Sequence, residues 1–171
     1  MSVWTARRIL KELADADRRR RIAAAFWKHA DASSKAMTIV QLAKSLHFRD
    51  ETIRKMPAEK KAELLASRAA LPEFEQTLEA ALMHYHTHEQ NAMLAAFLDY
   101  WHIPHVNGSI ETDDYTPPSA EQVRDAVRDL RGRFDPRDIA VYLASLGLLM
   151  GEPWQSAAWP EVDEAAELPG K

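Results

Sequence analysis

Residues 72–102 read PEFEQTLEAALMHYHTHEQNAMLAAFLDYWH, and this stretch decides the fold. Its apolar residues recur at intervals of three and four, which is the period of an amphipathic α-helix. Pro72 suits the first position of a helix, and Pro104 closes the segment. We therefore predict one long helix over residues 72–102.

Helix signals also dominate the rest of the chain, and strand signals are nearly absent. Asp15 or Asp17 is a candidate N-cap, and Ser119 with Gln122 makes a capping box for a later helix. The one irregular stretch carries an Asn107-Gly108 pair, which favours a tight turn or a minimal hairpin. The pattern predicts an all-α fold.

We expect a single multi-helix bundle or a short helical array of about seven or eight helices around the long helix 72–102. Residues 1–151 would form one domain. Residues 152–171 would be an acidic C-terminal tail, whose Trp154 and Trp159 dock onto the domain.

The amino-acid composition excludes several classes of protein function. The chain has 171 residues, 46% of them hydrophobic and 28% charged, which is the balance of a soluble globular domain. It has no cysteine, so disulfides, thiol catalysis and thiolate-bound metals are excluded. No secretory signal begins the sequence, and its longest apolar stretch is too short to span a bilayer. We expect a cytoplasmic protein with no membrane partner.

Charge is divided unevenly along the chain. Residues 1–61 carry 15 Lys and Arg against 7 Asp and Glu, a formal charge of +8, and residues 62–171 carry 7 against 19, or −12. Such asymmetry is found in proteins that bind polyanions. It also arises where two parts attract each other within a fold or across a dimer, and we favour this second interpretation.

The histidines of MHYHTHEQ, residues 83–90, look at first like a metal site. On a helical wheel, however, only His84 and His88 share a flank, at the i, i+4 spacing of metal ligands. His86 falls on the other flank. A metal site at His84 and His88 is therefore an alternative that needs ligands from elsewhere, and we expect no cofactor.

Glu89 is the residue of interest on the same wheel, because it points along the apolar stripe. A carboxylate is costly to bury unless it is paired or hydrogen-bonded. We predict that Glu89 is buried and forms a polar link with His86 or with an arginine. The alternative is a ligand-binding carboxylate. Asp99 and His102, at the aromatic-rich end of the helix, would stand at the mouth of a pocket or simply cap the helix.

Protonation is a further expectation for this region. From Ala69 to Val123 the sequence has no Lys or Arg, nine acids and five of the seven histidines. Neighbouring carboxylates favour protonated histidine. We therefore predict raised histidine pKa values in this region.

Residues 37–56, MTIVQLAKSLHFRDETIRKM, resemble a helix-turn-helix unit. Its outward residues would be those suited to phosphate or base contacts, namely Arg49, Thr52, Arg54 and Lys55. Two features depart from the pattern: His47 stands where the turn usually has glycine, and Pro57 cuts the second helix short. A helical corner inside an all-α domain fits the same residues.

The sequence contains no phosphate-binding glycine loop and no nucleophile elbow. We therefore predict a non-enzymatic protein-interaction or regulatory module that binds a protein partner or associates with itself as a homodimer. One alternative is a DNA-binding regulator that uses residues 37–56. The other is a metal- or small-ligand-binding protein centred on Glu89 and the nearby histidines.

Overall fold

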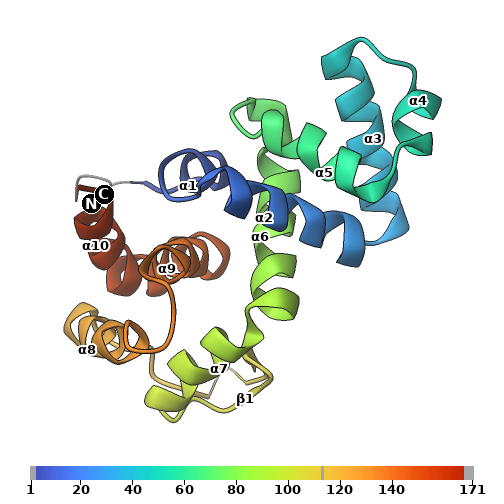
Figure 1. Cartoon of the computed structure of the whole chain (residues 1–171). Coiled ribbons are helices and arrows are strands. Elements are labelled where there is room, and N and C mark those ends of the chain that lie inside the picture. Colours follow the sequence, from blue (N-terminus) through green and yellow to red (C-terminus); the bar gives the residue numbers. More distant parts are fainter. Residues whose placement is uncertain (1–2, 113, 168–171) are drawn as a thin grey trace. The chain divides into compact units, whose positions relative to one another are not determined.

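The structure is a computed structural model that describes residues 3–112 and 114–167 (Figure 1). It confirms the all-α fold. The α-helices in these residues are α1 (Ala6–Glu12), α2 (Ala16–His29), α3 (Ala32–Leu46), α4 (Asp50–Lys55), α5 (Ala58–Ser67), α6 (Glu75–His84), α7 (Asn91–Tyr100), α8 (Ala120–Leu130), α9 (Pro136–Met150) and α10 (Trp154–Glu167). The shorter elements are a 3-10 helix η1 (Pro72–Phe74), a π-helix η2 (Tyr85–Glu89) and the strands β1 (His105–Val106) and β2 (Ser109–Ile110). No helix in the described ranges is both long and apolar enough to cross a membrane.

The chain divides into two compact units. We call Ala6–Tyr85 the N-terminal unit, and Met1–Thr5 together with His86–Lys171 the C-terminal unit. The boundary between them falls inside η2, within the stretch that was expected to be one continuous helix.

The N-terminal unit is built on α2, which packs against α5 and α6. Asp15 caps α2 as predicted, because its carboxylate accepts a hydrogen bond from the Arg18 backbone N–H at 2.8 Å. Glu75, at the start of α6, fixes the first turn of α1. One of its carboxylate oxygens accepts from the Ala6 backbone N–H at 2.5 Å, and the other accepts from Arg7 Nε at 2.7 Å.

The C-terminal unit is built on α9, whose residues from Ile139 to Gly147 are all buried. Helix α10 packs along α9 and α8, and α8 also contacts α7. Ser119 and Gln122 form the predicted capping box at the start of α8. The predicted hairpin is also present, with Asn107 and Gly108 at positive φ between β1 and β2.

Residues 154–167 are helix α10 and not a tail. Trp154 and Trp159 dock as expected, with exposed fractions of 1% and 3%. The indole Nε1 of Trp154 donates to the Tyr115 hydroxyl at 3.1 Å, and that of Trp159 donates to the Ala144 carbonyl at 3.2 Å. Two buried tryptophans make α10 part of the core, despite its acidic composition.

The predicted long helix over 72–102 is interrupted. It is divided into η1, α6, η2 and α7, and Gln90 leaves helical geometry with φ −123° and ψ 20°. A π-helical turn contains about one residue more than an α-helical turn, so the buried face after it falls one residue later in the sequence. On the wheel of an uninterrupted helix, Ala92 and Tyr100 fall on the apolar stripe, yet both are exposed. Met93 and Phe97 are buried in their place.

Candidate functional site

His86 is the buried polar residue of the histidine segment. Its exposed fraction is 4%, and its Nε2 lies 3.1 Å from the hydroxyl oxygen of Ser145 on α9. The Ser145 hydroxyl donates its single proton to the Val141 carbonyl at 2.7 Å. It therefore accepts from His86, which places a proton on Nε2. The predicted buried polar link involving His86 exists, with Ser145 as the partner.

The prediction that Glu89 is buried is wrong, because Glu89 is exposed. The wheel advanced about 100° per residue through this segment, whereas η2 turns less per residue. The π-turn carries Glu89 out to solvent and brings His86 in. The burial penalty that singled out Glu89 therefore does not apply to it.

The expected rise in histidine pKa is wrong for His86. Burial disfavours the charged imidazolium and lowers the pKa of His86 to about 3. The edge of its ring contacts Tyr142, with centroids 5.5 Å apart, so an aromatic neighbour stands where a carboxylate was expected. His86 is a neutral packing and hydrogen-bonding group near neutral pH.

This lowered pKa predicts acid sensitivity. An unfolded histidine has a pKa near 6.5, so between about pH 6.5 and pH 3 the unfolded chain binds a proton at residue 86 that the folded chain does not. The stability from neutral His86 is complete above this window and is lost as the pH falls through it. Between about pH 7.5 and 4.5 the wild type should lose about 2 kcal/mol more unfolding free energy than His86→Gln.

Urea unfolding at a series of pH values measures this difference. Ser145→Ala is the control. It removes the hydrogen-bond partner but leaves a histidine at the buried position, so its unfolding free energy should change with pH as steeply as that of the wild type. Equal pH slopes for the wild type and His86→Gln would contradict the assignment.

Asp99 and His102 are both exposed, and the His102 backbone N–H donates to the Asp99 carbonyl at 3.0 Å, at the end of α7. The Asp99 side chain pairs with His105, whose Nε2 lies 3.0 Å from the carboxylate Oδ1. This pairing ties the hairpin to the end of α7, and within the hairpin His105 Nδ1 accepts the Gly108 backbone N–H at 3.2 Å. Because Nδ1 accepts a hydrogen bond, Nε2 is the ring nitrogen that donates to Asp99.

The predicted metal pair is divided by the unit boundary. His84 belongs to the N-terminal unit and stacks on His29 of α2, with ring centroids 6.3 Å apart. His88 is exposed in η2, and its Nδ1 lies 3.0 Å from the Thr87 hydroxyl oxygen. Within residues 3–112 and 114–167, no group of three or more His, Cys, Asp or Glu could hold a metal ion.

The helix-turn-helix segment forms two packed helices, α3 and α4. His47 occupies the left-handed conformation, with φ 55° and ψ 37°, at the position where glycine is usual. Leu42, Ala43 and Ile53 are buried, and Leu46 is half-buried. The second helix has only six residues and begins with Asp50.

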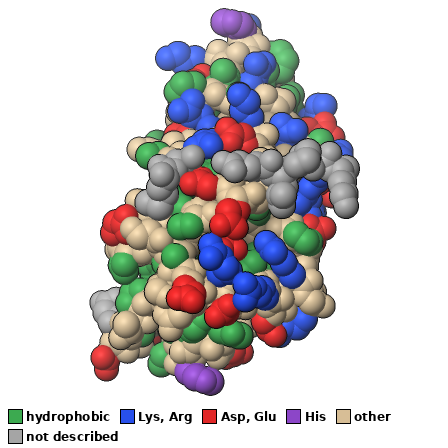
Figure 2. All heavy atoms as spheres, turned by 90° about the vertical axis from the view of Figure 1, so that its left-hand side faces the viewer, with side chains coloured by type: hydrophobic (Ala, Val, Ile, Leu, Met, Phe, Trp, Pro, Cys, Tyr) green, Lys and Arg blue, Asp and Glu red, His purple; other side chains and the backbone are tan. Residues whose placement is uncertain are grey.

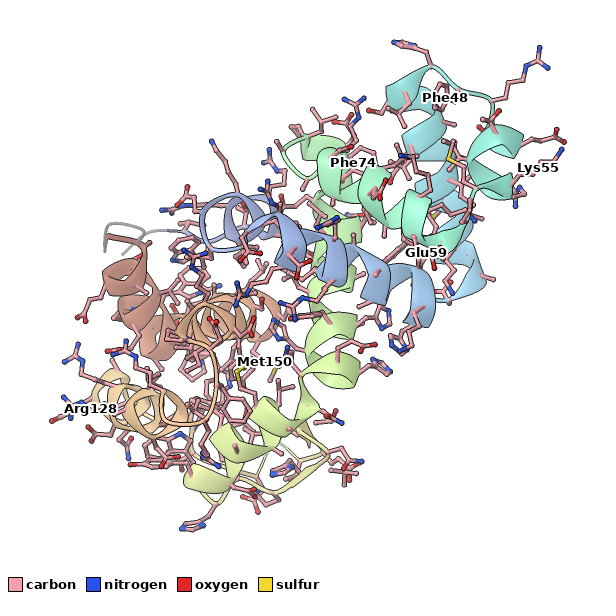
Figure 3. The ribbon with its side chains drawn as sticks, viewed as in Figure 1. Phe48, Lys55, Glu59, Phe74, Arg128 and Met150 are labelled. Carbon is pink, nitrogen blue, oxygen red and sulfur yellow. The ribbon has the colours of Figure 1, made fainter. Side chains whose placement is uncertain are left out.

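The outward side chains of this corner form a mixed apolar and basic surface. Met37 and Val40 on α3 are 61% and 48% exposed, and Phe48 is 47% exposed. Figure 3 labels Phe48 at the turn that follows α3. The four residues predicted to face outward are all exposed. We call the α3–α4 surface the set Met37, Val40, Lys44, Phe48, Arg49, Thr52, Arg54 and Lys55.

A cleft of about 110 Å³ borders this surface between α3 and α6. Met37 stands at its edge, and hydroxyl and amide groups line it. Thr77 is 9% exposed and donates to Gln41 Oε1 at 3.3 Å, and its hydroxyl lies 3.4 Å from that of Thr38. The cleft is uncharged and has about the volume of one side chain.

The uneven charge follows the two units. The N-terminal unit carries 16 Lys and Arg against 11 Asp and Glu, a formal charge of +5, and the C-terminal unit carries 6 against 15, or −9. On the face shown in Figure 2, side chains of both signs are intermingled. On that face, the net charge of each unit is therefore not gathered into one patch.

Sequence reasoning missed two features of these surfaces. It did not identify Met37, Val40 and Phe48 as exposed apolar residues, although Met37, Val40 and Lys44 lie within about 60° of one another on a wheel. It also did not pair Asp99 with His105. Comparison with known proteins adds nothing further, because no protein family, no curated protein and no solved structure matches this chain.

Proposed function

We propose that the protein is a non-enzymatic interaction module that binds an acidic protein surface through its α3–α4 surface. The observation that carries the proposal is the exposure of Met37, Val40 and Phe48 among basic residues. Large apolar side chains exposed together on a basic rim are typical of a binding site for a partner that is apolar and acidic.

Charge supports an acidic partner. Residues 35–61 contain seven Lys and Arg and three Asp and Glu, a formal charge of +4. A basic rim speeds the encounter with an acidic surface and rejects basic ones. The apolar side chains would then supply most of the binding free energy as they leave water.

DNA binding through the same corner is the second candidate. It is favoured by the left-handed turn at His47 and by the exposure of Arg49, Arg54 and Lys55. It is disfavoured by the apolar side chains on α3, since these do not contact phosphate favourably. The arrangement therefore supports a protein partner better than a nucleic acid.

A site-specific photocrosslink tests the proposal. A photoreactive amino acid at Val40 should form an adduct with an acidic protein in cells, and one at Ala24, exposed on α2, should not. Binding of the purified adduct partner should weaken about tenfold in Val40→Glu/Lys44→Glu, because the change buries charge and reverses one lysine.

The control Lys11→Glu/Ala24→Glu makes the same change in charge at exposed positions of α1 and α2, and it should leave binding unchanged. Equal adducts at Val40 and Ala24, or equal weakening by both double variants, would contradict the proposal. Salt-dependent binding of duplex DNA that Arg49→Ala/Arg54→Ala/Lys55→Ala abolishes would replace it with the second candidate.

A further inference from the structure

We infer that the partner of the α3–α4 surface is a second copy of this chain, bound through the acidic surface at the end of its α7 and hairpin. This inference rests on the proposed function and names its partner. Two copies would associate head to tail, with the N-terminal unit of one copy on the C-terminal unit of the next.

The C-terminal unit carries a surface of opposite charge with its own exposed apolar residues. Tyr100 at the end of α7 is 41% exposed, and Val106 in β1 is 52% exposed. Helix α7 contacts β1, and the pairing of Asp99 with His105 places the residues before Tyr100 and Val106 side by side. We call the α7–hairpin surface the set Asp99, Tyr100, Val106 and Glu111, the last of which directly follows β2.

The charged side chains of this surface are acidic. Asp99 and Glu111 are exposed, and the sequence has no Lys or Arg from residue 69 to residue 123. His105 Nε2 lies 3.0 Å from the Asp99 carboxylate, and His105 Nδ1 accepts the Gly108 N–H. The α7–hairpin surface thus presents apolar side chains with negative charge, and the α3–α4 surface presents apolar side chains with positive charge.

Some acids elsewhere in the C-terminal unit are paired with arginine. Glu161 is paired with Arg124 at 2.7 Å, and Asp129 with Arg133. The acids of the α7–hairpin surface instead belong to the stretch without Lys or Arg, and this surface also carries the exposed Tyr100 and Val106. This combination of apolar and acidic side chains complements the α3–α4 surface.

Electrostatics also favours two different surfaces over a self-complementary one. Two α3–α4 surfaces would bring like charges together, which costs several kcal/mol when they are close. The same is true of two α7–hairpin surfaces. Contact between unlike surfaces is heterologous, so the copies form a closed ring where the rotation closes and an open chain where it does not.

Sedimentation velocity of the full chain tests the inference. At about 50 mM salt the wild type should sediment faster as its concentration rises, and it should dissociate at about 500 mM salt, where charges more than a few ångströms apart are screened. Val40→Glu/Lys44→Glu breaks the basic surface and Val106→Lys/Glu111→Lys breaks the acidic one. Each double variant alone should stay monomeric at low salt.

An equimolar mixture of the two double variants gives the decisive result. One variant keeps an intact acidic surface and the other keeps an intact basic surface, so the mixture should form a dimer that does not grow further. The matched controls Lys11→Glu/Ala24→Glu and Glu121→Lys/Ala166→Lys change the charge equally at other exposed positions and should associate like the wild type.

A wild type that stays monomeric at every concentration and salt would overturn the inference. So would a mixture of the two variants that stays monomeric when the wild type associates. If the Val40 crosslink captures a different acidic protein and the wild type is monomeric, the proposed function stands and the second copy is excluded as partner.

Discussion

Replacing Trp4 with alanine should lower the free energy of unfolding by about 4 kcal/mol, the largest effect that we expect of any single substitution. Trp4 precedes α1, yet it belongs to the C-terminal unit and is 1% exposed. Its indole Nε1 donates to Asp163 of α10 at 3.0 Å. Loss of the ring would leave a cavity beside α10 and a carboxylate that has lost a donor.

Two variants separate packing from hydrogen bonding. Trp4→Phe keeps most of the apolar contact and loses the donor, so it should cost about 1.5 kcal/mol. Val3→Ala is the neighbouring control, because Val3 is 70% exposed and should change stability by less than about 0.5 kcal/mol. Chemical denaturation gives all three values.

Hydrogen exchange should locate the effect of Trp4→Ala. Peptides from α10 should lose protection, because Trp4 packs within the unit that contains α10. A Trp4→Ala protein with wild-type stability, or with exchange increased only in α2 and α5, would show that the segment before α1 does not stabilise the C-terminal unit.

Local features of the fold were predictable from the sequence because they depend on residues close in the chain. Asp15 and the Ser119–Gln122 pair satisfy the first backbone N–H groups of their own helices. Asn107 and Gly108 adopt positive φ angles at the turn of their own hairpin. Each of these needs only a few neighbouring residues.

The π-turn η2 was not predicted, because its cause lies in packing. On an uninterrupted wheel Leu94 and Leu98 fall about 160° and 200° from the apolar stripe, on the exposed side. The structure buries both of them. A break of one residue lets α6 bury Leu78 and Leu82 in one unit while α7 buries its own large side chains in the other. The signal of this break in the sequence was the position of Leu94 and Leu98, which lie opposite a stripe of alanines on the uninterrupted wheel.

The candidate site was only partly predictable for the same reason. The outward residues of α3–α4 follow from local helix geometry, and Arg49, Thr52, Arg54 and Lys55 are exposed as predicted. The predicted burial of Glu89 came from a helical wheel that was extended across η2, and this prediction failed. A wheel is reliable only as far as the helix keeps one hydrogen-bonding pattern.

Gly147→Ala should destabilise the protein by about 3 kcal/mol, although alanine is the better helix former. Gly147 lies inside α9, and the indole ring of Trp159 from α10 rests directly on it. A methyl group there would meet Trp159 Nε1 at 2.3 Å and two ring carbons at 2.8 Å. The ring cannot move aside without breaking its hydrogen bond to the Ala144 carbonyl.

A double-mutant cycle isolates this contact. In Trp159→Ala, which removes the ring, Gly147→Ala should no longer destabilise and should gain about 1 kcal/mol from helix propensity. Gly132→Ala is the matched control, because its methyl group would meet only the Asp129 carbonyl, at 3.4 Å. A loss of stability from Gly147→Ala that persists in the absence of the ring would show that the glycine is required by the backbone of α9. Recovery of stability would establish that the approach of α10 to α9 selects glycine at position 147.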